Sequence, residues 1–154
     1  MVMRKLVRAG VTCFVNLVAQ SELMQLYDYR ADALSISKSS RQESLTMSFI
    51  HHPIPDGGVC GDEEMLNVVN KVAHMLKDGH VCYVHCYGGH GRAGALCAIL
   101  LGLAYRLDAD DALARIQAYH NMREDTEARI GLGLSPQTAV QHDQVKRMLS
   151  MVSN

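Results

Sequence analysis

The fold is decided by the stretch HVCYVHCYGGHGRAGALCAILLGLAY, which spans residues 80–105. Its first part, 80–84, is short and apolar and predicts a buried strand, whereas 93–106 is apolar on nearly every side and predicts a buried helix. Between them, residues 86–92 form a glycine-rich turn. A strand that ends in such a turn and continues as a helix brings backbone N–H groups and the positive end of the helix dipole to one concavity. The sequence therefore predicts a phosphate-binding loop.

The predicted loop begins with Cys86 and ends with Arg92. A helix N-terminus and a nearby arginine both stabilise a thiolate, the form in which cysteine acts as a nucleophile. The planar guanidinium of an arginine can hold two phosphate oxygens at once. We expect the loop glycines Gly88, Gly89 and Gly91 to take positive-φ conformations, which only glycine adopts without strain. These residue types predict a nucleophile at one end of the loop and an oxyanion clamp at the other.

Strands and helices alternate along the rest of the chain, which predicts one α/β domain over residues 1–154 with a central, mostly parallel sheet flanked by helices. Further strands are predicted at 10–18 and 45–51, and further helices at 21–34, 62–78, from Asp108 or Asp110 to about Met122, and 135–151. Two of these helices have a predicted core face. It comprises Leu23, Leu26 and Tyr27 in the first helix, and Leu66, Val69, Val72, Ala73 and Leu76 in the second.

Composition and charge exclude several classes of protein. The hydrophobic share of 48% and the charged share of 20% are typical of a globular domain. A net charge of −1 gives no electrostatic footprint for nucleic acid or for stable association with an anionic membrane. The N-terminal residues lack the apolar stretch of a signal peptide, and five cysteines without a C-x-x-C pair do not suggest a disulfide framework. We therefore expect a cytoplasmic protein, with its oligomeric state left open.

The segment His85-Cys86 to Arg92-Ala93-Gly94 resembles the H-C-x5-R-[ST]-G signature of the protein tyrosine phosphatase superfamily, and it is most similar to small dual-specificity-like members. The resemblance covers about residues 10–150. It implies that Cys86 forms a cysteinyl-phosphate, that His85 orients the loop, and that no metal or cofactor takes part. The resemblance also implies a phosphorylated protein as the partner. The phosphate-binding residues that it implies are Tyr87, Gly88, Gly89, His90, Gly91 and Arg92.

Two further segments resemble parts of that superfamily. Residues 51–58, HHPIPDGG, are similar to its mobile acid loop. Because cleavage of a phosphate ester leaves an oxyanion that needs a proton, a carboxylic acid over the pocket is expected, and Asp56 is assigned this role. Asp62 is the alternative, although its place suits the start of a helix. Residues 135–141 are similar to the segment that carries a water-positioning glutamine, which makes Gln137 and Gln141 supporting candidates.

Other interpretations of the same residues remain open. His80, Cys82, His85, Cys86 and His90 are of zinc-binding types, but a strand alternates its side chains and no second ligand pair has suitable spacing, so no metal site is predicted. A phosphate-binding pseudophosphatase is the second hypothesis, supported by Ala93 alone. A phosphoinositide phosphatase is a further alternative, although residues 87–91 contain no lysine. The added Asn-Arg-Tyr element of the large tyrosine-specific domains is absent, which favours a site open to phosphotyrosine and to phosphoserine or phosphothreonine.

Ala93 stands where the superfamily has serine or threonine, whose hydroxyl stabilises the thiolate as it leaves in the second chemical step. A hydrogen bond to a charged group contributes about 1.5–3 kcal/mol, so breakdown of the phosphoenzyme is expected to be roughly 10- to 100-fold slower. Rapid-mixing kinetics should therefore show a burst of product, and Ala93→Ser should speed steady-state turnover. A linear time course with no gain from the substitution would contradict this prediction.

Overall fold

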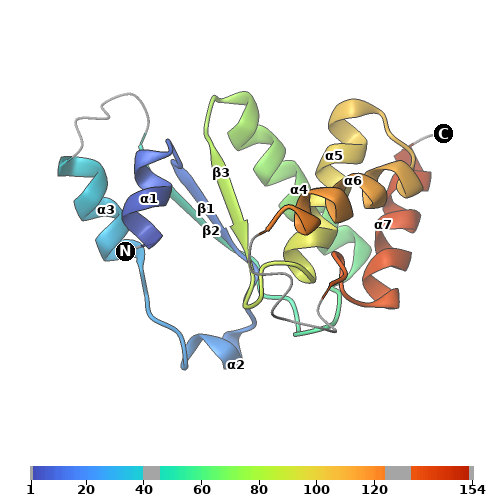
Figure 1. The fold of residues 1–154 in the computed structure, drawn as a ribbon, viewed down its shortest axis with the longest axis horizontal. Helices are drawn as coiled ribbons and strands as arrows, with labels where there is room; N and C mark the ends of the chain where they lie inside the picture. The colour runs from blue at the N-terminus through green and yellow to red at the C-terminus, as the bar shows by residue number, and fades with distance from the viewer. Residues whose placement is uncertain (1, 40–45, 124–132, 153–154) are drawn as a thin grey trace.

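The computed structural model describes residues 2–39, 46–123 and 133–152 of the chain (Figure 1). Helices and strands alternate through most of these residues. The elements in chain order are α1 Val2–Arg8, β1 Cys13–Asn16, α2 Gln20–Leu23, α3 Arg30–Ser39, β2 Ser48–His51, α4 Asp62–Lys77, β3 Cys82–His85, α5 Arg92–Tyr105, α6 Ala109–Asn121 and α7 Ala139–Val152.

The described strands form one parallel sheet in the order β2-β1-β3. Cys13 of β1 is aligned with Ser48 of β2 and with Cys82 of β3. Because all three strands run in the same direction, their carboxyl ends meet at one edge, which is where open α/β sheets bind ligands. The predicted α/β architecture with a mostly parallel sheet is confirmed, and the loop that follows β3 starts at this edge.

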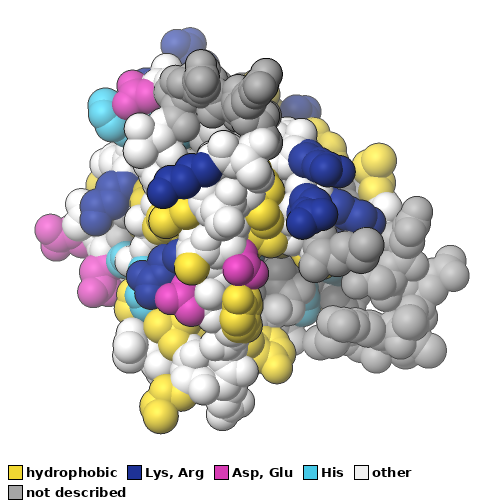
Figure 2. All heavy atoms as spheres, turned by 90° about the vertical axis from the view of Figure 1, so that its left-hand side faces the viewer, with side chains coloured by type: hydrophobic (Ala, Val, Ile, Leu, Met, Phe, Trp, Pro, Cys, Tyr) yellow, Lys and Arg dark blue, Asp and Glu magenta, His cyan; other side chains and the backbone are white. Residues whose placement is uncertain are grey.

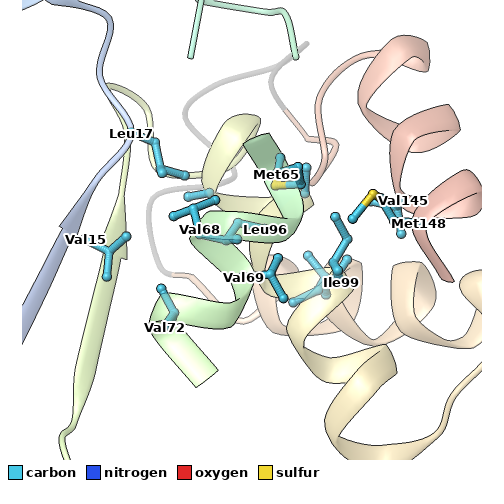
Figure 3. Packing of buried hydrophobic residues seen from close by; sticks show 14 of the residues in the cluster. Val15, Leu17, Met65, Val68, Val69, Val72, Leu96, Ile99, Val145 and Met148 are labelled. Carbon is cyan, nitrogen blue, oxygen red and sulfur yellow. The ribbon is translucent and has the colours of Figure 1, made fainter. Parts of the chain in front are cut away.

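Helices cover both faces of the sheet (Figure 1). Since side chains alternate along a strand, Val15 points to the side of α4, α5 and α7, and Phe14 points to the side of α1 and α3. Figure 3 shows the larger core, in which side chains of α4 and α5 meet those of β1 and α7. Its labelled members are Val15, Leu17, Met65, Val68, Val69, Val72, Leu96, Ile99, Val145 and Met148.

The predicted helix 21–34 is wrong. Two helices, α2 and α3, replace it, and Tyr27 between them is 73% exposed rather than part of a core face. Asp28 accounts for the break, because its side chain accepts hydrogen bonds from the backbone N–H of Arg30 (3.1 Å) and from the Arg30 guanidinium (2.7 Å). A side chain that binds nearby backbone in this way competes with helical hydrogen bonds and favours a turn.

The predicted core face of α4 is partly wrong. Val69 and Val72 are buried as expected, but Leu66 is 40% exposed, and the adjacent Met65 is 1% exposed in its place. A helix with apolar residues at many positions offers two overlapping stripes, and the choice between them depends on packing rather than on spacing. Leu76 is also exposed, at 49%, and Ala73 is only half-buried.

The ends of several elements differ from prediction. The strands are shorter than expected, and residue 45 of the predicted strand 45–51 lies outside the described residues. Asp108, and not Asp110, caps α6 by accepting the N–H of Asp111 at 2.8 Å. The last helix begins at Ala139 rather than at Ser135. Among the described residues, no helix is long and apolar enough to cross a membrane.

The contrast between Met65 and Leu66 gives a matched test of the core. Met65→Ala should lower the free energy of unfolding by about 2–5 kcal/mol, because it removes a fully buried side chain and leaves a cavity. Leu66→Ala should cost about 1 kcal/mol or less, since that side chain is partly exposed. Urea denaturation of both variants measures the difference. Equal losses would mean that the face of α4 is misassigned.

Candidate active site

The loop between β3 and α5 is built as a tight, glycine-dependent turn. Gly89 has φ +71°, in the left-handed region, but Gly88 and Gly91 do not, so the prediction of positive φ holds for one glycine of the three. Gly88 and Gly91 instead lie close to neighbouring side chains. A Cβ on Gly88 would lie 2.9 Å from Nε2 of His90, and one on Gly91 would lie 3.2 Å from Nε2 of Gln141.

Cys86 opens this loop directly after β3 and is 8% exposed. The first hydrogen bond of α5 runs from the N–H of Ala95 to the carbonyl of Gly91, at 3.0 Å. The N–H groups that precede Ala95 in the first turn therefore lie outside the ladder of the helix, where they are available to an anion. Cys86 and the start of α5 thus lie at the two ends of one short loop, where the sequence predicts a phosphate-binding site.

Arg92 is 2% exposed, and two segments bind its guanidinium. Nη1 donates to Oε2 of Glu22 at 2.6 Å and to the carbonyl of Ile54 at 2.9 Å. Nη2 donates to Oε1 of Glu22 at 3.1 Å and to Oδ1 of Asp56 at 2.9 Å. The fork is therefore held rigidly and paired with two carboxylates. Hydrogen bonds from Arg92 lower the pKa of Glu22.

Sequence reasoning did not identify Glu22. It lies in α2, inside the segment predicted as a regular helix, and one of its carboxylate oxygens also accepts the N–H of Ala19 at 2.9 Å. That contact is a local signal of a helix start, but the partner Arg92 lies 70 residues away in the chain. Spacing within one segment could not have revealed the pair.

The structure places Asp56 beside Arg92, whereas it places Asp62 against α7. The side chain of Asp56 is 75% exposed and reaches across to the buried guanidinium. Asp62 instead binds Nη2 of Arg147 and Nε2 of Gln144, at 3.0 and 2.9 Å, and hydrogen bonds from Arg147 lower its pKa. These contacts tie α4 to α7 and favour the structural role for Asp62.

His85 links the loop to the other face of the sheet. Its Nε2 lies 2.5 Å from the hydroxyl of Tyr29, and its Nδ1 lies 3.4 Å from the carbonyl of Cys86. Burial lowers the pKa of His85 and raises the pKa of Tyr29 to about 12, so the ring is neutral and the hydroxyl keeps its proton. Because a carbonyl only accepts, Nδ1 carries the ring proton and Nε2 accepts from Tyr29. Tyr29 is a second residue that sequence reasoning missed.

His90 lies within the loop, and Gln137 and Gln141 lie beside it. His90 is buried, at 6% exposure, and its Nδ1 lies 3.1 Å from the carbonyl of Leu134. Gln141 is 1% exposed, and its Oε1 accepts the N–H groups of Gln137 and Thr138. The half-buried Gln137 lies next to Gly91, since a Cβ there would be 3.3 Å from Oε1 of Gln137.

The remaining predicted positions lie as follows. Ala93 is 4% exposed in the first turn of α5. Tyr87 is 66% exposed at the mouth of the loop. His80, one of the zinc-binding types, instead contacts the hydroxyl of Thr12 through Nδ1 at 3.0 Å. Within residues 2–39, 46–123 and 133–152, no three His, Cys, Asp or Glu side chains are grouped so that they could hold a metal ion.

A cleft of about 1090 Å³ opens beside the loop, on the side of α1 and α3. Cys86, Tyr87 and Gly88 line one end, and Tyr29 and Leu23 belong to its walls. Figure 2 shows the face of the molecule on the side of α1 and α3, where basic, acidic and hydrophobic side chains are interspersed. The site can therefore receive an oxyanion at Cys86 while the rest of a substrate extends into the cleft.

Comparisons with known proteins agree with this geometry. Residues 2–147 match the family described as PTP-SAK, a Swiss Army Knife protein, DSP-PTPase phosphatase domain. A protein of Invertebrate iridescent virus 3 that is named as a tyrosine phosphatase (067L) is 30% identical over 125 residues, which are 78% of this chain and 46% of that protein. The chain thus spans less than half the length of this relative.

Solved structures share the fold at lower identity. Tk-PTP in its active form superposes with a TM-score of 0.72 at 20% identity, covering 96% of this chain and 84% of that one. PTPMT1 in complex with PI(5)P gives a TM-score of 0.71 at 16% identity, covering 98% of this chain and 85% of that one. At these identities the likeness concerns the fold alone.

The pair of Glu22 and Arg92 predicts a pH-dependent stability. Glu22→Gln should lower the free energy of unfolding by about 1.5–3 kcal/mol at neutral pH, because a charge-assisted hydrogen bond to a buried guanidinium is lost. The folded pKa of Glu22 is below its ordinary value. Its contribution is therefore complete above the ordinary glutamate pKa and disappears as the pH falls through the lowered one.

Urea denaturation of wild type and Glu22→Gln across acidic and neutral pH measures this difference. Glu63→Gln, which changes an exposed carboxylate of α4, is the control and should cost less than about 1 kcal/mol. A difference between wild type and Glu22→Gln that stays constant in acid would show that charge pairing is not its origin.

Proposed function

Because this chain belongs to the PTP-SAK family of DSP-PTPase phosphatase domains, we propose that it is a cysteine-dependent phosphatase that hydrolyses phosphomonoesters on protein tyrosine, and on serine or threonine. The observation that carries the proposal is the position of Arg92. Arg92 begins α5 at the far end of the loop that Cys86 opens, and its guanidinium is buried, so the two could share one bound phosphate. The partner would be a phosphorylated protein, and the expected setting is the cytoplasm.

In the proposed mechanism, the Cys86 thiolate attacks phosphorus in line with the leaving oxygen. A P–S bond forms as the P–O bond breaks, and Asp56 gives its proton to the leaving oxygen. Water then attacks the cysteinyl-phosphate, Asp56 takes a proton from it, and the thiolate leaves with both electrons of the P–S bond. Gln137, next to Gly91, would orient that water. No other reactant is required.

The guanidinium of Arg92 has to exchange partners in this mechanism. Its Nη2 is bound to Asp56, and a phosphate that binds Arg92 would compete for the same donor. Displacement by a dianion would leave the carboxyl of Asp56 free to take up the proton that it later donates. Glu22 is not displaced in this scheme, because it binds both Nη1 and Nη2 and keeps the fork oriented.

Two alternative functions remain, and assays of turnover distinguish them from the proposed one. A phosphate-binding pseudophosphatase is supported by Ala93, which lacks the hydroxyl that assists the second step. A phosphoinositide phosphatase is the other alternative, and PTPMT1 bound to PI(5)P shares the fold. The loop residues 87–91 contain no lysine to bind a highly charged inositol head group, which favours a phosphoprotein substrate.

Hydrolysis of a chromogenic aryl phosphate tests the proposal directly. We expect turnover by the wild type and its loss in Cys86→Ser, by a factor of about 10⁴ or more, because a serine hydroxyl is a far weaker nucleophile here. Cys60→Ser is the matched control and should keep its activity, since burial raises the pKa of the Cys60 thiol to about 11 and makes it unreactive.

Activity that survives Cys86→Ser would refute the mechanism. Tungstate binding without turnover by the wild type would favour the pseudophosphatase. Turnover should then be compared on a phosphotyrosine peptide, a phosphothreonine peptide and a phosphoinositide. Selective hydrolysis of the phosphoinositide would mean that the substrate is a lipid rather than a protein.

A further inference from the structure

We propose that Thr138 and Gln141 are positioning residues that fasten the segment carrying Asp56 to the phosphate-binding loop. The claim that these residues position the acid rests on the proposed function, because it takes Asp56 as the proton donor. The claim that they anchor the segment rests on contacts alone. A mobile acid loop was expected at this segment. Instead, two hydrogen bonds tie the segment to the start of α7 and the residue before it.

Both hydrogen bonds end on the two residues that follow Asp56. The hydroxyl of Thr138 donates to the carbonyl of Gly57 at 3.0 Å, and Nε2 of Gln141 donates to the carbonyl of Gly58 at 3.1 Å. Gly57 has φ +66°, a conformation in which glycine is strongly favoured. The turn after Asp56 is therefore fixed by its own backbone and by two side chains that lie about 80 residues further along the chain.

The anchoring groups are themselves held firmly. Gln141 is 1% exposed, and its Oε1 accepts N–H groups from Gln137 at 3.0 Å and Thr138 at 3.2 Å. The same amide lies against the loop, where a Cβ on Gly91 would be 3.2 Å from Nε2. One buried amide thus makes hydrogen bonds to the start of α7 and to the turn after Asp56, and it also lies against the phosphate-binding loop. Buried polar groups satisfied in this way rigidify the structure around them.

This anchor matters because the other contact of Asp56 is with Arg92. The side chain is 75% exposed, and its oxygen binds Nη2 of Arg92. A phosphate bound at Arg92 would compete for that donor, so the hydrogen bond cannot hold Asp56 during the reaction. The backbone anchor would still hold it. Thr138 and Gln141 would keep the carboxyl over the site at the moment when protonation of the leaving oxygen is needed.

Thr138→Val tests the anchor, because it removes the hydroxyl and keeps the shape of the side chain. Thr138→Ser keeps the hydroxyl and should behave as the wild type does. If the acid is misplaced, kcat/KM for phenyl phosphate, which reports the first chemical step, should fall about 10-fold, part of the 10²–10⁴ that an acid contributes. Dinitrophenyl phosphate needs no proton on its leaving group, so its kcat/KM should change by less than about 2-fold.

Hydrogen–deuterium exchange of residues 54–58 measures the anchor without reference to activity. Exchange should rise in Thr138→Val and stay at the wild-type level in Thr138→Ser. Arg147→Ala, which breaks the ion pair between α7 and Asp62 of α4, is the control and should change neither exchange in 54–58 nor the ratio of the two esters.

Unchanged exchange in Thr138→Val would overturn the anchor. Raised exchange with an equal loss on both esters, or with no loss, would overturn its role in placing the acid. If the wild type hydrolyses neither ester, the proposed function fails, and raised exchange would still support the anchor alone.

Discussion

Arg92 must be paired because it is buried. Moving a guanidinium out of water costs several kcal/mol, and only close opposite charge and complete hydrogen bonding offset that cost. The required groups come from two separate segments: Glu22 comes from α2, and the carbonyl of Ile54 and the carboxylate of Asp56 come from the segment after β2. The charge of one side chain thereby determines where α2 and the segment after β2 lie. The organisation of the site depends on this single requirement.

The sheet explains why these segments are within reach of one another. All three described strands are parallel, so the chain leaves each of them at the same edge. α2 follows β1, the segment with Asp56 follows β2, and the loop with Cys86 follows β3. Each strand therefore delivers one part of the site. From outside this pattern, α7 contributes through its first residues and the turn before them.

The sequence was most informative where the determinants were local. The strand, turn and helix over residues 80–105 could be predicted because apolar pattern, glycines and helix start follow one another directly, and the family resemblance of this stretch is confirmed. Glu22, Tyr29 and Thr138 could not be found in that way, since each acts on a partner more than 50 residues away. The helix predicted at 21–34 failed because hydrogen bonds of Asp28 outweigh apolar periodicity, and the face of α4 was misplaced because neighbouring stripes were equally apolar.

The contact between Asp56 and Arg92 has a consequence for the end of the catalytic cycle. Inorganic phosphate, once formed, would have to share a guanidinium for which an internal carboxylate already competes. In the proposed reaction, the carboxylate of Asp56 would compete with the product for the guanidinium of Arg92. Departure of phosphate would thereby be favoured, and accumulated product should inhibit the protein only weakly.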